Sequence, residues 1–185
     1  MKLERLFCTT MLVVCLSVAA GAKKMNLLNP DKGQIFNTTN GCEVSLTEEH
    51  AKKGETMIKV DLGGGGWWAG IENPKSFKGF DLMKFRLFNA DKAPIKLAFH
   101  VKFNDYSCPW EKRFVYDFMA KPGENEIEIE ILGATTVDGT PIDWGTKIIA
   151  GSFTGEAKKC TLYFGKITLE TSEDSDKDGK DGKKQ

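Results

Sequence analysis

Short stretches in which hydrophobic and polar residues alternate recur along the chain from residue 43 to residue 170. Within residues 95–103 every second residue is hydrophobic, whereas His100 and Lys102 fall on the other face. A period of two is typical of a β-strand that packs one face on a core and turns the other to water. By this pattern, or by a run of β-forming residues, we predict eight strands, at residues 43–47, 56–62, 82–89, 95–103, 113–119, 126–132, 147–153 and 161–170.

Turn-forming residues separate these predicted strands at short intervals. Examples are Lys53-Gly54, the four glycines at residues 63–66, the segment 121–125 and Asp138-Gly139. Only residues 48–53 could form a helical turn. Many short strands, frequent turns and no substantial helix predict an all-β sandwich or barrel and exclude α/β enzyme architectures.

The first 22 residues have the pattern of a cleavable signal peptide. Lys2 and Arg5 precede a hydrophobic run from residue 6 to residue 20, and small residues at 20–22 follow it. The run is too short to span a bilayer comfortably, so we expect a secreted or periplasmic protein without a transmembrane segment after cleavage. A lipoprotein would use Cys15, but Val14 is larger than the residue that normally precedes an acylated cysteine, which disfavours that alternative.

The remaining chain divides into three parts. Residues 23–42 form a lead-in with one short strand, residues 43–170 form the β-sandwich domain, and residues 171–185 lack any hydrophobic residue. The last part therefore predicts a disordered charged tail. Without residues 1–22 the chain has 24 basic and 25 acidic residues and a net charge of −1, which disfavours a nucleic-acid partner.

Three cysteines, Cys42, Cys108 and Cys160, follow the signal peptide. Export permits one disulfide with one thiol left over, and buried thiols are the alternative. The pairing stays open. The wide spacing of the cysteines without accompanying histidines argues against a zinc site.

Several segments, taken in order, resemble the galactose-binding-like jelly rolls found among carbohydrate-binding modules. The matching stretches are residues 44–50, 54–60, 80–89, 103–105, 111–114 and 121–127. The resemblance runs from Glu43 to Glu170. It implies a two-sheet antiparallel β-sandwich, a jelly roll of about eight to nine strands, whose partner is a polysaccharide or other glycan. Relatives hold a structural calcium with an aspartate of the last strand, where this chain has Gly165, so the calcium is doubtful and no cofactor is expected.

Aromatic residues near turns are the candidates for glycan contact, because the hydrophobic faces of sugar rings stack on indole and phenol rings. Adjacent residues of a strand face opposite ways, so one of the two tryptophans that follow the four glycines is expected to be exposed. Each tryptophan could instead cap the core, and we expect Trp144 to do so. The candidate carbohydrate-binding residues are Trp67, Trp68, Asp105, Tyr106, Trp110 and Arg113.

Candidates for catalysis or metal binding are weaker. Glu126, Glu128 and Glu130 alternate with isoleucines and could share one face, but any half-exposed strand has this pattern. His50 and His100 have no nucleophile or metal ligand at a recognisable spacing. In the tail, three aspartates begin a calcium loop that is incomplete because its twelfth position is Gln185. They are Asp174, Asp176 and Asp178.

The leading hypothesis is therefore an exported, noncatalytic carbohydrate-binding domain with weak affinity for glycans. The alternative is an envelope-structural or protein-interaction β-sandwich that binds another exported protein. A glycan-cleaving enzyme is the third hypothesis, and it requires Glu126, Glu128 or Glu130 to lie in a cleft.

Overall fold

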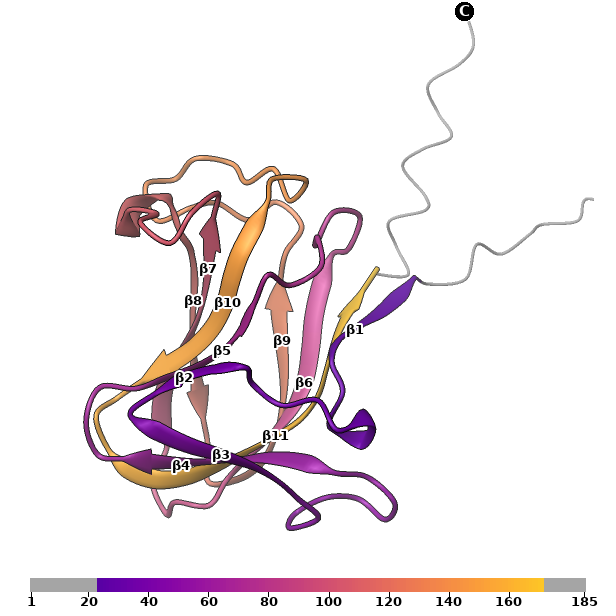
Figure 1. Cartoon of the computed structure of the whole chain (residues 1–185), viewed down its shortest axis with the longest axis vertical. Helices are drawn as coiled ribbons and strands as arrows, with labels where there is room; N and C mark the ends of the chain where they lie inside the picture. The colour runs from indigo at the N-terminus through magenta and orange to yellow at the C-terminus, as the bar shows by residue number, and fades with distance from the viewer. Residues whose placement is uncertain (1–22, 172–185) are drawn as a thin grey trace, which may run out of the picture.

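A computed structural model describes residues 23–171 of the chain, and the predicted signal peptide and nearly all of the predicted tail, with Asp174, Asp176 and Asp178, lie outside this range. The described part contains eleven strands and two short 3₁₀ turns (Figure 1). The strands are β1 (Lys24–Leu28), β2 (Thr38–Asn40), β3 (Cys42–Thr47), β4 (Met57–Gly63), β5 (Trp68–Glu72), β6 (Leu82–Asn89), β7 (Ile95–Phe103), β8 (Phe114–Ala120), β9 (Gly123–Glu130), β10 (Ile148–Gly155) and β11 (Lys159–Glu170). The 3₁₀ turns are η1 (Pro30–Lys32) and η2 (Trp110–Lys112).

The strands form two antiparallel sheets. The first sheet has the order β3-β4-β11-β6-β9, with β1 paired to the end of β11. The second sheet has the order β2-β5-β10-β7-β8. Neighbouring strands are often distant in sequence, as in a jelly roll, and the all-β sandwich predicted from the sequence is confirmed.

The core lies between the two sheets and is rich in phenylalanine. In β6 the buried residues alternate with half-buried ones, as the hydrophobic pattern predicted. Phe153 of the second sheet packs on Phe85 and Phe164 of the first, with ring centroids 5.3 and 5.0 Å apart. These aromatic contacts join the layers and hold the second sheet in a fixed position.

All eight strands predicted between residues 43 and 170 are present, with ends displaced by at most three residues. The largest displacement is in β9, which begins at Gly123. Asn125 causes it, because its side chain accepts a hydrogen bond from the backbone N–H of Lys121 and donates to the carbonyls of Lys121 and Gly123. This compact turn lets Gly123 pair with Asn89 of β6.

Three details differ from the sequence prediction. The segment 23–42 supplies two strands, β1 to the first sheet and β2 to the second, rather than one. Strand β5 follows the four glycines, at a position where no strand was predicted. Residues 48–53 form turns instead of a helical turn, and within residues 23–171 no helix could span a membrane.

The three cysteines of the described chain are free thiols, of which Cys108 is buried and Cys42 and Cys160 are half-buried. Cys42 and Cys160 both pair with Leu62, from opposite sides of β4. They are therefore two strand spacings, about 10 Å, apart, which is beyond the Cα separation of a disulfide. Burial raises the pKa of both thiols.

Candidate functional site

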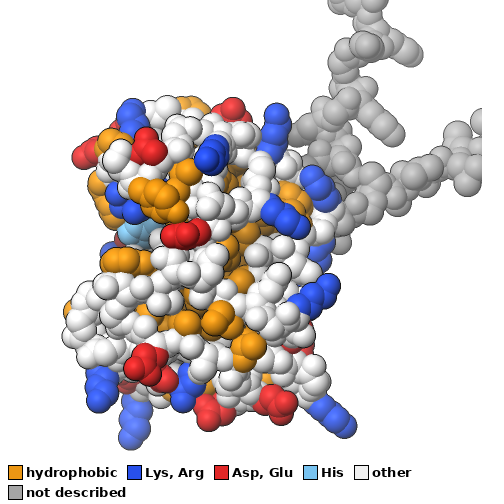
Figure 2. Space-filling view, viewed as in Figure 1, with side chains coloured by type: hydrophobic (Ala, Val, Ile, Leu, Met, Phe, Trp, Pro, Cys, Tyr) orange, Lys and Arg blue, Asp and Glu red, His pale blue; other side chains and the backbone are white. Residues whose placement is uncertain are grey.

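A groove of about 410 Å³ crosses the outer face of the second sheet. In Figure 2 exposed hydrophobic side chains lie beside a histidine on this side of the molecule. The walls and floor of the groove come from strands β2, β5, β7 and β10 and from the loop that contains η2. The lining residues are Thr38, Trp68, Glu72, His100, Lys102, Tyr106, Trp110, Arg113, Ala150, Ser152 and Thr154.

The strand register explains why the groove is hollow. Thr38, Gly70, Ser152 and His100 form one row across four strands. Gly70 lies in the middle of this row, and a Cβ atom there would lie 2.7 Å from the carbonyl oxygen of Gly151. Because no side chain fits at this position, the floor stays low between the aromatic walls.

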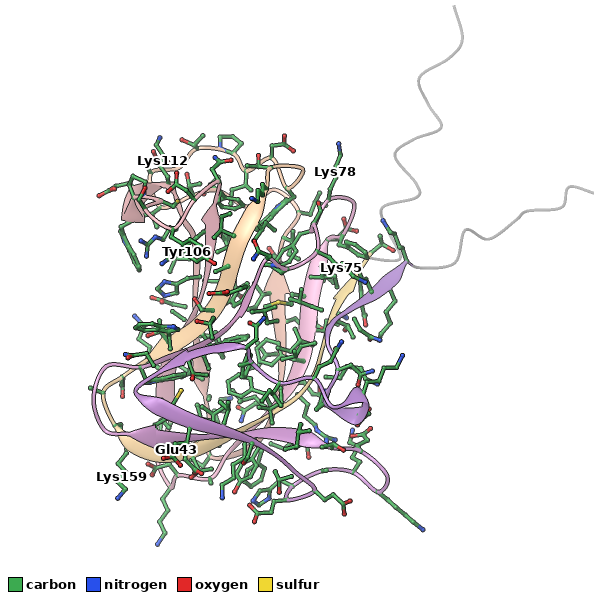
Figure 3. The ribbon with its side chains drawn as sticks, in the orientation of Figure 1. Glu43, Lys75, Lys78, Tyr106, Lys112 and Lys159 are labelled. Atoms are coloured by element: carbon green, nitrogen blue, oxygen red, sulfur yellow. The ribbon has the colours of Figure 1, made fainter. Side chains whose placement is uncertain are left out.

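Three aromatic side chains at the groove are exposed although they are large. Trp68 projects from β5 with 44% of its surface exposed, Trp110 lies in η2 with 46% exposed, and Tyr106 lies in the preceding loop with 56% exposed. Figure 3 labels Tyr106, whose side chain reaches from the loop toward β10. Soluble domains seldom expose several such rings in one place without a ligand to cover them.

Polar groups lie between the aromatic rings. Burial, and then the charge of the nearby Glu72 carboxylate, raise the pKa of the Tyr106 phenol. His100 packs edge-to-face on Trp110, with ring centroids 5.0 Å apart. Burial, and then the charge of Arg113, lower the pKa of His100, so the imidazole is neutral at pH 7. A neutral imidazole can both donate and accept a hydrogen bond.

The groove continues past Trp110 into a second hollow of about 310 Å³. Trp110, His100 and Thr154 line both hollows. Together the two hollows form a path that crosses the sheet, with Trp110 in the middle. This shape suits an extended chain better than a single compact molecule.

The sequence candidates divide into two groups. Trp68, Tyr106, Trp110 and Arg113 come together at the groove. Trp67 does not, since its side chain is buried in the core at 2% exposure and its indole N–H donates to the carbonyl of Glu156, 3.3 Å away. The expectation that one of the two adjacent tryptophans is exposed holds, but Trp67 is corrected to a core residue.

Asp105 also lies outside the groove. Its Oδ1 atom accepts hydrogen bonds from the backbone N–H of Ser107, at 2.7 Å, and from its hydroxyl, at 2.6 Å. The carboxylate therefore shapes the loop that carries Tyr106. Trp144 is buried as expected, and its indole N–H donates to the carbonyl of Ile131 at 2.9 Å.

Sequence reasoning did not select several residues that line the groove. His100 and Lys102 were assigned correctly to the wet face of β7 by the alternation, which was the only available signal. Glu72, Ser152 and Thr154 gave no signal, because only pairing between strands distant in sequence brings them together.

The glutamates of β9 lie on the other sheet, away from the groove. Glu126, Glu128 and Glu130 are exposed, and Glu128 pairs with Lys84 at 2.9 Å. The solvated-face interpretation is confirmed for all three. Glu126 alone of them borders a shallow hollow whose other lining residues are mostly charged.

The same hollow contains Gly165, where the resemblance would place a calcium-binding aspartate. Three of the four carboxylates that line this hollow are held by cations, and only Glu126 has no such partner among residues 23–171. Asp31 pairs with Lys166 at 3.2 Å, Glu170 with Lys24, and Glu55 with Arg86 at 2.9 Å. A calcium ion needs oxygen ligands that are not paired with ammonium groups. The residues present do not fit a structural calcium.

Comparison with known proteins finds similarity of structure but not of sequence. No protein-family model and no curated protein matches the chain. A family 11 carbohydrate-binding module from Clostridium thermocellum, solved with a β-1,3-1,4-mixed-linked tetrasaccharide, matches with a TM-score of 0.60 at 14% identity, over 82% of this chain and 96% of that one. A family 29 module in complex with cellulohexaose matches with a TM-score of 0.53 at 12% identity, over 82% and 92% of the two chains.

An exo-β-agarase also matches, with a TM-score of 0.61 at 10% identity, but over 80% of this chain and only 25% of that chain. The likeness is therefore to one part of the enzyme. At these identities the comparisons show the fold alone. The domain is a jelly-roll β-sandwich, the same fold as these carbohydrate-binding modules, as the sequence resemblance implied.

Proposed function

We propose that this protein is an exported, noncatalytic domain that binds a glycan in the groove on the second sheet. The observation that carries the proposal is the convergence of three exposed aromatic rings, Trp68, Tyr106 and Trp110, on one extended hollow. The fold is the one that carbohydrate-binding modules use, which supports this assignment. Export is proposed from the signal-peptide pattern at residues 1–22.

The chemistry of the groove suits a sugar chain. Indole and phenol rings offer flat hydrophobic faces to the C–H faces of pyranose rings. Glu72, His100 and Ser152 supply acceptors and donors for hydroxyl groups. Two or three such contacts must offset the ordering of a flexible chain, so we expect dissociation constants from about 10 μM to 1 mM.

Titration with a polysaccharide panel tests the proposal. The protein from residue 23 onward is titrated while tryptophan fluorescence is followed, and affinity electrophoresis in gels that contain each polysaccharide gives an independent measurement. Trp68→Ala and Trp110→Ala should each weaken binding about tenfold. Leu132→Ala is the matched control, because Leu132 is an exposed hydrophobic residue that does not line the groove.

Binding to no member of the panel would sink the proposal. So would binding that Trp68→Ala and Trp110→Ala leave unchanged, because the ligand would then lie elsewhere on the molecule.

A further inference from the structure

The two arginines of the described chain have different electrostatic partners. Arg86 is nearly buried, its Nη2 atom lies 2.9 Å from a carboxylate oxygen of Glu55, and its Nε atom lies 3.8 Å from Glu124. Arg113 has no carboxylate within 4 Å among residues 23–171, and its hydrogen bonds go to a backbone carbonyl. A guanidinium group in a groove without an acidic partner can bind a carboxylate of a ligand in a bidentate geometry.

The hydrogen bonds that hold Arg113 in place leave one edge of its guanidinium group free to bind a ligand. Its Nε and Nη2 atoms both donate to the carbonyl oxygen of Cys108, at 3.0 and 2.9 Å. The guanidinium carbon lies 5.6 Å from the centroid of the Trp110 ring. A guanidinium group has five N–H donors, and the bonds to Cys108 use the one on Nε and one of the two on Nη2. The other N–H of Nη2 and the adjacent N–H of Nη1 point in the same direction and form a pair of free donors. That pair matches the two oxygens of a carboxylate.

A second cation lies on the same side of the groove. Lys102 lies two residues after His100 on the same face of β7, and both residues line the groove together with Arg113. Burial and then the charge of Arg113 lower the pKa of His100, the charge of Asp117 raises it, and the charge of Lys102 lowers it. No carboxylate of the described chain pairs with Lys102 within 4 Å. Burial keeps His100 neutral, so it adds a hydrogen-bonding group without adding charge.

The nearest acidic groups do not pair with the cations on the side of the groove lined by Lys102 and Arg113. Glu72 lies on β5 and is separated from Lys102 by Ala150 of β10. Asp117, in the adjoining hollow, pairs with Lys96 at 2.8 Å. The groove therefore has an acidic side at β5 and an unmatched basic side at the β7–β8 end.

We propose that the groove binds a glycan that carries carboxylates, a polymer containing uronic acid, and that the carboxylate of one sugar binds the free edge of Arg113 with Lys102 beside it. This inference rests on the proposed function and specifies its ligand class. The uronic acid ring lies near Trp110, and a neighbouring sugar lies between Trp68 and Glu72, where hydroxyl donors meet the acidic side.

The test compares pairs of oligosaccharides that share a backbone and differ in whether C6 carries a free carboxylate. The pairs are β-1,4-linked glucose hexamers with and without oxidation of C6 to a carboxylate, and galacturonate hexamers with free or methyl-esterified carboxylates. Isothermal titration of the protein from residue 23 onward should give at least about tenfold tighter binding of each carboxylate form at low salt. The preference should shrink at about 500 mM salt, where charges are screened within a few ångströms.

Arg113→Gln and Lys102→Gln should reduce the preference to about twofold or less, whereas Arg113→Lys, which keeps the charge but lacks the paired donors, should retain part of it. Lys121→Gln is the control, because it removes one exposed positive charge outside the groove. Thermal unfolding of each variant shows that it is folded.

Equal affinity for the charged and neutral forms would overturn this inference and leave the proposed function standing. A preference that survives Arg113→Gln and Lys102→Gln, or tighter binding of a sulfated hexamer than of the carboxylate form, would overturn it as well. Failure of every hexamer and of the polysaccharide panel would overturn both proposals together.

Discussion

Two adjacent tryptophans should respond in opposite ways to the same substitution. Trp67 and Trp68 have the same side chain and neighbouring positions, but 2% of the first and 44% of the second is exposed. Trp67→Ala removes a buried indole and leaves the carbonyl of Glu156 without its N–H donor. Trp68→Ala removes a ring from the wall of the groove and leaves the core intact.

The size of the effect follows from the buried area. A fully buried indole removes about 200 Å² of surface from water, which corresponds to roughly 5 kcal/mol at 25 cal/mol per Å². Measured costs of replacing a core tryptophan by alanine are about 3–5 kcal/mol, so we expect about 4 kcal/mol for Trp67→Ala. In a domain of this size that lowers the melting temperature by roughly 10 °C. Trp68→Ala should change stability by less than about 1 kcal/mol.

Calorimetry and urea titration measure stability, and affinity electrophoresis measures glycan binding. Trp67→Ala should lose stability and, below its melting temperature, keep most of its affinity, whereas Trp68→Ala should lose affinity and keep its melting temperature. Trp67→Phe serves as a control, because a smaller ring in the same cavity should cost less than alanine. Equal loss of stability in both alanine variants would refute the assignment of opposite faces.

Three further predictions concern groups outside the groove. Asn89 is buried and donates hydrogen bonds to the carbonyls of Ala93 and Ala120, each at 3.0 Å. Asn89→Ala should therefore lower the free energy of unfolding, measured by urea titration, by about 2–3 kcal/mol. A decrease below about 1 kcal/mol would contradict this prediction. A hydrogen bond from the Thr56 backbone N–H lowers the pKa of Asp31 in the folded protein. The ionised Asp31 carboxylate therefore stabilises the fold above the pKa that it has in the unfolded chain, and this stabilisation is lost as the pH falls below about 4. Asp31→Asn should therefore lower the urea midpoint at pH 7 more than at pH 3, and equal shifts would refute the prediction. Burial raises the pKa of Tyr163 to about 12, so an ultraviolet absorbance titration should show a tyrosine that ionises near pH 12 and is missing in Tyr163→Phe. Stability should fall as the pH rises from about 10 to 12, because the folded state then holds a proton that the unfolded chain has lost.

The alternation of hydrophobic and polar residues was sufficient to locate most of the sheets, because core-facing positions of long strands are set by local sequence. The alternation did not predict β5, because the core-facing residues of this strand give only a weak hydrophobic signal. The strand follows four glycines, and it contains the small residues Ala69 and Gly70, both buried. Such a segment becomes a strand because β2 and β10 pair with its two edges, and local pattern does not contain that information.

The candidate site was predicted only in part for the same reason. Aromatic residues near turns identified Trp68, Tyr106 and Trp110, since large exposed rings in loops are uncommon without a function. The choice between Trp67 and Trp68 required the register of β5. Recognising Arg113 as a cation without an acidic partner required the positions of residues from several strands, which no local pattern provides.

The first and last described residues bond directly to each other. The backbone N–H of Lys23 donates to the Thr171 hydroxyl at 2.8 Å, the N–H of Thr171 donates to the carbonyl of Lys23 at 3.0 Å, and β1 pairs antiparallel with the end of β11 (Figure 1). Tension applied through these two ends would therefore break the hydrogen bonds between β1 and β11 one after another, instead of loading all of them at once. Such a ladder yields at low force. Because the groove belongs to the other sheet, separation of β1 from β11 would leave the strands of the groove paired.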